Sequence, residues 1–276
     1  MVSIRNLKFR YSKKQSPLFE ELSCELAPGS IVGLLGKNGA GKTSLLKLMV
    51  GLLQPSEGSV SVLDHRPSAR QASFLEDIYF LPEEFHQPSV SIKKYVKANA
   101  GFYPRFDEAL LKRLLIDFEL PDDKQLNQLS YGQKKKFLIA FALSTKCRLL
   151  VFDEPTNGLD IPSKAIFRRI MAGSLDEDQL VIISTHQVRD VENLIDKVLM
   201  LEQGNFIMQK DLHDISAKLH FTTTSTPHGE NVLYYEMVPG GYRVITPQTA
   251  GSSPVDIELL FNAISTGNEK MREYVK

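Results

Sequence analysis

The chain has 276 residues, of which 42% are hydrophobic, and its 33 lysines and arginines balance 33 aspartates and glutamates. This length suffices for one large domain or two smaller ones. Because affinity for nucleic acid rests on surplus basic charge, a net charge of zero argues against a nucleic-acid partner. Cys24 and Cys147 lie far apart without metal-ligand spacing, so we expect two buried thiols in a reducing compartment, and neither a disulfide nor a zinc site.

Apolar runs and helical periodicity alternate along the first 210 residues. Buried strands are predicted at residues 30–35, 148–152 and 180–184, and helices at residues 43–50, 91–100 and 108–118. Strands that alternate with helices are typical of a parallel sheet. We therefore predict an α/β fold with a mostly parallel sheet, interrupted by a helical insertion at about residues 85–147. No apolar run approaches the length that a membrane-spanning helix needs, and the first residues do not resemble a signal peptide.

The pattern of apolar and polar residues changes after about residue 210. Residues 222–229 are polar and predict a loop. Strands are expected at residues 232–238 and 242–245, and a short helix at residues 254–264. We interpret residues 211–276 as a small α+β accessory unit, and residues 1–210 as the principal domain.

Residues 36–43, GKNGAGKT, match the pattern G-x-x-x-x-G-K-[ST] between a predicted strand and a predicted helix. Glycines let the backbone curl so that its N–H groups can surround phosphate oxygens, and the following helix presents its positive end to the same anion. Lys42 is expected to meet the β- and γ-phosphates, and the Thr43 hydroxyl to bind Mg²⁺. The alternative interpretation is a glycine turn before a helix. The position between strand and helix favours a P-loop NTPase.

A second motif, LLVFDEP at residues 149–155, is an apolar strand that ends in two adjacent carboxylates. A strand buried on both faces places its first polar residues at the carboxyl edge of the sheet, where ligands of α/β sheets bind. Asp153 is expected to hold Mg²⁺ through water, and Glu154 to accept a proton from the attacking water. Alone, the two acids could equally be solvated in a surface loop, but the phosphate loop upstream favours the catalytic interpretation.

Three further segments, LSYGQ at residues 129–133, NGLD at 157–160 and STH at 184–186, complete an ordered pattern. Their order and spacing resemble the ATPase subunits of ATP-binding cassette (ABC) transporters, over about residues 2–210. In that family the first segment is the signature, usually LSGGQ, the second is the D-loop and the third contains the switch histidine.

The resemblance implies a role for each matching residue. Tyr11 would stack on adenine, although a tyrosine beside a strand is often a core residue, and His186 would bind the γ-phosphate and orient the water. Ser130 and Gly132 would contact ATP bound to a second subunit, and Asp160 would lie at that interface. The residues expected at the nucleotide are Tyr11, Gly36, Asn38, Gly39, Ala40, Gly41, Lys42, Thr43, Ser44, Glu83, Ser130, Gly132, Gln133 and Asp160. Those expected to be catalytic are Glu154, His186 and Lys42, and those expected at the metal are Thr43, Asp153 and Glu83.

The chain departs from the usual family pattern at several positions. Glu83 stands where glutamine is usual, with Glu84 as an alternative alignment. Tyr131 replaces the first glycine of the signature, which is acceptable if that position does not need a left-handed backbone. Lys136 replaces an arginine, and the run of residues 134–136 predicts a solvated helix face.

The resemblance implies an ATP- and Mg²⁺-dependent ATPase that forms a homodimer or heterodimer around two ATP molecules. It would drive a separate polytopic membrane permease from the cytoplasmic face of the membrane, and a groove in the helical insertion beside Glu83 would receive a short permease helix. The segment from residue 204 and the tail resemble ATPases of drug- and lipid-type exporters, so export is expected. The alternatives are a soluble ABC-type ATPase without a transport role and a P-loop kinase, which would not need the LSYGQ segment.

Overall fold

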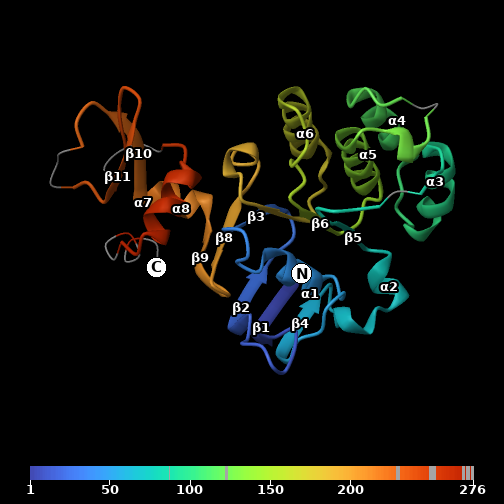
Figure 1. The fold of residues 1–276 in the computed structure, drawn as a ribbon, viewed down its shortest axis with the longest axis horizontal. Helices are drawn as coiled ribbons and strands as arrows, with labels where there is room; N and C mark the ends of the chain where they lie inside the picture. Colours follow the sequence, from blue (N-terminus) through green and yellow to red (C-terminus); the bar gives the residue numbers. More distant parts are fainter. Residues whose placement is uncertain are drawn as a thin grey trace.

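The computed structural model describes residues 1–86, 88–121, 124–227, 231–248, 253–268, 271 and 274. Within them the strands form three sheets, of which the central one has the order β5-β6-β7-β3-β8-β9 (Figure 1). Its strands are β3 (Ser30–Leu35), β5 (Ile78–Leu81), β6 (Leu149–Asp153), β7 (Leu180–Thr185), β8 (Lys197–Glu202) and β9 (Asn205–Asp211). Neighbouring strands are parallel except at the edge, where β9 runs antiparallel to β8. The predicted α/β fold with a mostly parallel sheet is confirmed.

The three predicted strands correspond to β3, β6 and β7, each within one residue of its expected bounds. Every residue of β6 and β7 is buried. Both faces of the central sheet are covered, which explains why these strands are continuous apolar runs and do not alternate with polar residues.

A second, antiparallel sheet with the order β2-β1-β4 lies below the central sheet in Figure 1. Its strands are β1 (Val2–Phe9), β2 (Phe19–Leu26) and β4 (Glu57–Val62). Helix α1 (Lys42–Met49) shares one core with both sheets: Leu45 and Met49 pack in the same cluster as Val32, Ile182 and Val62. This packing fixes the start of α1 next to the end of β3, where the phosphate loop lies.

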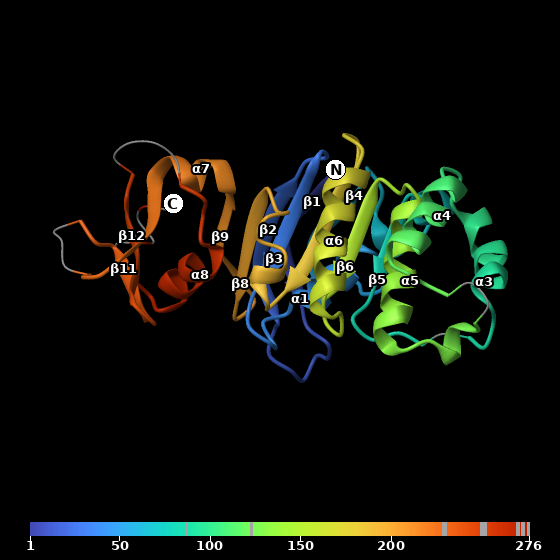
Figure 2. The same ribbon diagram turned by 90° about the horizontal axis from the view of Figure 1, so that it is seen from above.

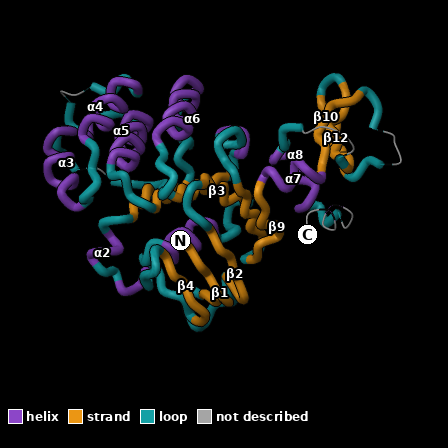
Figure 3. Tube along the Cα trace, turned by 180° about the vertical axis from the view of Figure 1, so that it is seen from behind, coloured by secondary structure: helices purple, strands orange, loops and turns teal. Residues whose placement is uncertain are grey.

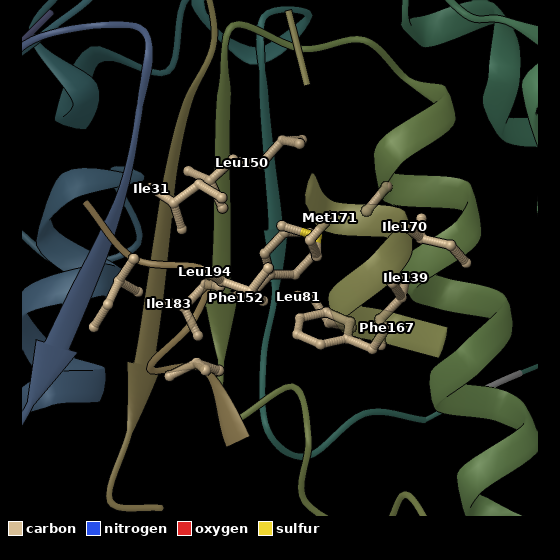
Figure 4. Close-up of a cluster of buried hydrophobic side chains, with 14 of the residues drawn as sticks. Ile31, Leu81, Ile139, Leu150, Phe152, Phe167, Ile170, Met171, Ile183 and Leu194 are labelled. Carbon is tan, nitrogen blue, oxygen red and sulfur yellow. The ribbon is translucent and has the colours of Figure 1, made fainter. Parts of the chain in front are cut away.

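The opposite face of the central sheet is covered by α5 (Tyr131–Ser144) and α6 (Ile161–Ser174). Figure 4 shows Phe152 and Ile183 of the sheet against Phe167 and Ile170 of α6 and Ile139 of α5. The remaining helical segments up to η4 are η1 (Pro67–Ala69), α2 (Ala72–Leu75), α3 (Ile92–Asn99), η2 (Ala100–Phe102), α4 (Glu108–Asp117), η3 (Leu126–Gln128) and η4 (Val188–Asp190). Helices α3 and α4 lie at the predicted positions.

Capping side chains explain the starts of the two inserted helices. The Ser91 side chain accepts from the Lys94 N–H at 3.3 Å, and the Asp107 side chain accepts from the Leu110 N–H at 2.8 Å. Phe141 of α5 then anchors the insertion, because its ring lies 5.3–6.2 Å from five other rings, those of Tyr79, Tyr95, Tyr103, Phe106 and Phe137. Such aromatic pairs add to the stabilisation that burial alone provides.

The C-terminal residues form a third sheet with the order β10-β12-β11, at the opposite end of the molecule from α3 and α4 (Figures 2 and 3). The elements are α7 (Leu212–Lys218), β10 (Leu219–Thr224), β11 (Tyr234–Val238), β12 (Gly241–Pro247) and α8 (Ile257–Ser265). Arg189 of η4 pairs with Glu258 of α8 at 2.6 Å, which ties this unit to the segment after β7.

Three expectations about the tail differ from the structure. Residues 222–224 belong to β10 and not to a loop, because these threonines pair with β12 and β-branched residues suit strands; residues 228 and 229 of the predicted loop lie outside the described residues. The strand expected from residue 232 begins at Tyr234. The last helix begins at Ile257 because Asp256 caps it, accepting from the Leu259 N–H at 2.8 Å.

Both cysteines are free and buried, as the sequence predicted. Burial raises the pKa of each thiol, Cys24 and Cys147, to about 12. In the part of the chain that the structure describes, no helix combines the length and the apolarity that crossing a membrane would require.

Candidate functional site

The ends of three neighbouring strands bring the predicted phosphate loop and carboxylates together. Asp153 ends β6, Thr185 ends β7 and Gly36 follows β3, and these strands are adjacent and parallel. Their carboxyl ends therefore meet at one edge of the sheet, which is where ligands of such sheets bind.

The loop of residues 36–43 has a conformation that requires glycine. Gly39 and Gly41 have φ values of 81° and 105°, and a Cβ atom on Gly36 would collide with the Leu201 carbonyl oxygen. Lys42 folds back over the loop: its Nζ donates to the carbonyl oxygens of Gly36 at 2.8 Å and Lys37 at 3.3 Å. Lys42, which the sequence assigned to the phosphates, is therefore surrounded by the loop, and only 7% of the residue is exposed.

Two residues that the sequence assigned to the metal, Thr43 and Asp153, are in contact beside this loop. The Thr43 hydroxyl donates to Asp153 Oδ2 at 2.7 Å, and the Ser184 hydroxyl donates to Asp153 Oδ1 at 2.5 Å. Mg²⁺ prefers oxygen ligands, and in nucleotide sites it is bound through one or two protein groups together with phosphate oxygens. Thr43 and Asp153 fit that donor set.

Glu154 is surrounded by groups that orient its carboxylate. Its Oε1 accepts from the His186 backbone N–H at 3.1 Å, lies 2.8 Å from His186 Nδ1 and lies 3.7 Å from Lys42 Nζ. The other oxygen, Oε2, is buried and has no hydrogen-bond partner among the described residues. The Glu154 side chain thus has one oxygen anchored and one available to accept a proton, which is the arrangement that a general base needs.

Tyr11 lies outside the core, which argues against the structural interpretation of this residue. Its side chain is 61% exposed, its hydroxyl lies 2.6 Å from Ser44 Oγ of α1, and its ring meets Phe9 edge-on at 4.9 Å. Further along the loop, Asn38 lines a cavity of about 250 Å³ together with His186 and with Phe261 of α8. Ala40 is buried in the core beneath the loop.

The signature residues form the start of α5. Ser130 and Gln133 make a capping box: Ser130 Oγ accepts from the Gln133 N–H at 3.2 Å, and Gln133 Oε1 accepts from the Ser130 N–H at 3.1 Å. Gly132 allows close contact with the D-loop, because a Cβ atom there would lie 2.9 Å from the Gly158 carbonyl oxygen. Figure 1 shows α5 and α1 on opposite faces of the central sheet.

Tyr131 is compatible with its position because it is the first residue of α5 and has a helical backbone, so no left-handed conformation is needed. Its hydroxyl donates to the Glu83 carbonyl oxygen at 2.8 Å, and its ring stacks on Phe85 with centroids 5.3 Å apart. The Glu83 carboxylate accepts from Asn157 Nδ2 at 2.9 Å. Asn157 Oδ1 in turn accepts from Gln187 at 3.1 Å.

Asp160 caps α6, accepting from the Ser163 N–H at 2.9 Å. Hydrogen bonding to Ser163 lowers the pKa of the Asp160 carboxyl. Within the chain this residue therefore has a structural role at the start of α6.

The prediction of a solvated face for residues 134–136 is wrong at Lys135. That side chain is fully buried, and its Nζ donates to the carbonyl oxygens of Glu154 at 2.7 Å and Asn157 at 3.2 Å. Burial lowers the pKa of the Lys135 ammonium to about 8. The helical period could have indicated that Lys135 is buried, because Lys135 precedes the buried Ile139 by four residues and Ala142 by seven. Asn157, Ser184 and Gln187 are further contacts at the site for which the sequence offered no individual role.

Comparison with known proteins identifies the family of this chain. The family described as ABC transporter matches residues 19–157, which are half of the chain. The chain belongs to the ABC transporter family. This ABC ATPase is 31% identical over 218 residues to a probable metal transport system ATP-binding protein of Chlamydia trachomatis, covering 72% of this chain and 87% of that one. It is 29% identical over 204 residues to Nod factor export ATP-binding protein I of Rhizobium etli, covering 72% and 65%.

Among solved structures, a dimeric ATP-binding cassette in a post-hydrolysis state, bound to ADP and Pi, superposes on this ABC ATPase with a TM-score of 0.65. The two are 20% identical, and the match covers 77% of this chain and 99% of that one, so it confirms the fold. The ABC ATPase is the ATP-binding subunit of an ABC transporter and hydrolyses ATP. Because its relatives include both a metal transport system and an exporter, the comparisons do not support the narrower likeness to drug- and lipid-type exporters.

Proposed function

We propose that Lys42, Thr43, Asp153, Glu154 and His186 form the ATP hydrolysis site of this ABC ATPase. The observation that carries the proposal is the hydrogen-bonded chain from Thr43 through Asp153 to Ser184, beside a Glu154 carboxylate that contacts both His186 and Lys42. Thr43 and Asp153 would bind Mg²⁺, which supplies positive charge at the phosphate oxygens. Glu83, whose carboxylate accepts from Asn157, is proposed as a further residue at the metal.

The phosphate loop binds the triphosphate through its backbone N–H groups and Lys42, and Tyr11 stacks on the adenine. Water attacks the γ-phosphorus: the new O–P bond forms as the bond to the ADP oxygen breaks. The proton of the water passes to Glu154 Oε2, while His186 fixes the carboxylate through Oε1. General-base assistance of this kind contributes typically about 10²–10⁴-fold to the rate.

We further propose that two copies of the chain, or this chain and a related subunit, enclose two ATP molecules. Ser130, Gly132 and Gln133 at the N-terminus of α5 would contact the γ-phosphate bound by the partner, because a helix N-terminus favours anions. Asp160 would lie at the same interface. In this proposal residues 1–210 are the nucleotide-binding domain, residues 85–147 are its helical subdomain, and residues 211–276 are an accessory unit.

Disulfide formation between copies tests the shared site. A mixture of Asn38→Cys and Ser130→Cys chains, both also carrying Glu154→Gln, should form a disulfide-linked dimer under mild oxidation when ATP is added. Neither variant alone should do so, and Ile116→Cys, which is exposed on α4, serves as the control partner. The buried native thiols should remain unreactive. A mixture that binds ATP and dimerises but shows no linkage would exclude the arrangement.

A cleft of about 540 Å³ suggests where the permease binds. It lies between the end of α1, helix α2 and η2, and its walls include Leu52, Phe80 and Phe102. Leu52 and Phe102 are 51% and 70% exposed, so an apolar helix face could bury both. We propose that the cleft receives a short helix of the polytopic permease at the cytoplasmic face of the membrane. The groove predicted beside Glu83 was placed in the helical insertion; the cleft has Phe102 of that insertion on one wall and Phe80 of β5, the strand that ends two residues before Glu83, on another.

Charge substitution tests the permease cleft. Phe102→Glu should abolish co-purification with a polytopic membrane protein from solubilised membranes while ATP binding is retained. Ile116→Glu, an equally apolar and 77% exposed position outside the cleft, should leave co-purification intact. If both variants retain the permease, the cleft is not the docking site. If the wild-type chain captures no polytopic protein at all, a soluble ABC-type ATPase becomes the better description.

The direction of transport is also part of the proposal. We propose that the transporter exports its substrate. The feature that supports this direction is the strand-rich C-terminal unit that follows β9. The test uses membrane vesicles that contain the captured complex with the ATPase on the outside, and it measures transport of a substrate. ATP-dependent accumulation of a substrate inside the vesicles supports export, and ATP-dependent loss of preloaded substrate overturns it.

A further inference from the structure

Lys135 is a buried cation that the hydrolysis mechanism does not use. It lies on α5 one turn after the signature, its side chain is fully buried, and its Nζ donates hydrogen bonds to two backbone carbonyl oxygens. Burying an ammonium group is costly unless strong acceptors surround it. A lysine at this position therefore indicates that the carbonyl groups it contacts need to be fixed.

Those carbonyl groups belong to the turn that carries the catalytic base. Glu154 has a φ of 48°, a left-handed conformation that is uncommon for a residue other than glycine. Its N–H donates to the Ser184 carbonyl oxygen at 3.1 Å, and its C=O accepts from Lys135 at 2.7 Å. The peptide groups on both sides of the Glu154 Cα atom are thus anchored, one by β7 and one by α5. Strained backbone of this kind persists only where neighbouring contacts stabilise it.

The second contact of Lys135 extends the same link to the switch segment. Its Nζ donates to the Asn157 carbonyl oxygen, and the Asn157 side chain joins Glu83 to Gln187, which follows His186. Lys135 therefore contacts the turn at both of its ends, at residues 154 and 157.

Tyr131 lies four residues before Lys135 on α5, and it packs against the same segment of residues 154–158. A Cβ atom on Gly158 would lie 2.7 Å from the Tyr131 ring, and the Lys135 Nζ lies 5.4 Å from the centroid of that ring. The face of α5 that carries Tyr131 and Lys135 is thus joined to residues 154–158. The same helix begins at Ser130, which the proposed function assigns to the ATP of the partner subunit.

We propose that Lys135 is a positioning residue for Glu154, and that it connects the signature helix, which contacts one ATP, to the base that acts on the other. This inference rests on the proposed function, since it requires Glu154 to be the base. Lys135 touches neither ATP nor water in this scheme. It acts by fixing the backbone from which the Glu154 carboxylate projects.

Substitution of Lys135 should separate kcat from KM. Lys135→Met has a similar volume but cannot donate, so kcat should fall by roughly 10–100-fold, the cost of displacing a reacting group by about 1 Å. KM for ATP should change by less than about threefold, because the phosphate loop is untouched. Lys135→Gln retains an amide donor and should recover part of the loss. Lys134→Met, the neighbouring residue on α5 and partly exposed, is the matched control and should keep the wild-type kcat.

A double-mutant cycle with Glu154→Gln distinguishes positioning from a general structural defect. If Lys135 acts through the base, adding Lys135→Met to Glu154→Gln should slow single-turnover hydrolysis by less than about twofold, whereas independent effects multiply. Multiplicative losses overturn the inference, and so does a wild-type kcat in a folded Lys135→Met or Lys135→Gln chain. If Lys135→Met does not fold, Lys135→Gln decides alone. A wild-type rate in Glu154→Gln itself would instead refute the proposed function.

Discussion

The substitution Glu154→Gln tests the centre of the mechanism. Glutamine has the same shape as glutamate, and its oxygen can still accept from the His186 backbone N–H where Oε1 does, at 3.1 Å. What it loses is the ability of the Oε2 position to accept a proton. A loss of general-base assistance lowers the rate about 10²–10⁴-fold, equivalent to roughly 2.7–5.4 kcal/mol of barrier.

ATP affinity should not fall with turnover. Glu154 Oε1 lies 3.7 Å from Lys42 Nζ, so the substitution removes a negative charge beside the lysine that is proposed to bind phosphate. Removing it leaves Lys42 more attractive to an anion. We therefore expect binding of ATP to be as tight as in the wild type or tighter, with an ATP-bound dimer that persists during gel filtration.

Phosphate release should be measured with Mg²⁺ and ATP on the purified, permease-coupled protein, together with binding of a fluorescent ATP analogue. Glu20→Gln, an exposed carboxylate on β2, is the matched control and should leave both quantities unchanged. The reasoning fails if Glu154→Gln turns over ATP within about twofold of the wild type. It also fails if the variant loses ATP binding, because the loss of turnover would then not report on the base.

Three further outcomes are expected. Phe141→Ala should lower the free energy of unfolding by about 3–5 kcal/mol in a urea titration, since it removes a buried ring that meets five others, whereas Ile116→Ala on the exposed face of α4 should change it by less than about 0.5 kcal/mol. Cys24 and Cys147, whose pKa values burial raises to about 12, should be thiolates at pH 8 in only about one molecule in ten thousand, so the native protein should react with iodoacetamide far more slowly than the urea-unfolded chain; rapid alkylation of the native chain would contradict this. Asp153→Asn should raise the Mg²⁺ concentration for half-maximal ATPase activity by about 10–100-fold, and an unchanged Mg²⁺ requirement would remove Asp153 from the metal site.

The sequence predicted those parts of the fold in which local pattern and tertiary environment agree. The strands β3, β6 and β7 are uninterrupted apolar runs because both faces of the sheet are covered, and the phosphate loop is read from its glycines and its place between strand and helix. The tail was harder, since the polar residues 222–224 become a strand only by pairing with β12, a partner about 20 residues further along the chain.

Contacts between distant segments were the part of the site that residue patterns could not supply. Lys135 belongs to a run of three lysines, and local composition favours a solvated face for all of them. The helical spacing to Ile139 and Ala142 indicated a buried position, but only the packing of α5 against the turn after β6 shows which groups the middle lysine contacts. The same applies to Asn157, which reaches Glu83 across 74 positions of sequence.

A single packing arrangement explains how the chain accommodates a departure from the usual family pattern. A tyrosine in place of the first signature glycine would protrude from α5, but here its ring lies between Phe85 and Gly158 and its hydroxyl bonds to the Glu83 backbone. The glycine at 158, with a φ of 80°, is what makes room for that ring. Tyr131, Lys135 and the turn after Glu154 therefore constrain one another, so these side chains contribute to fixing the start of α5 relative to Glu154.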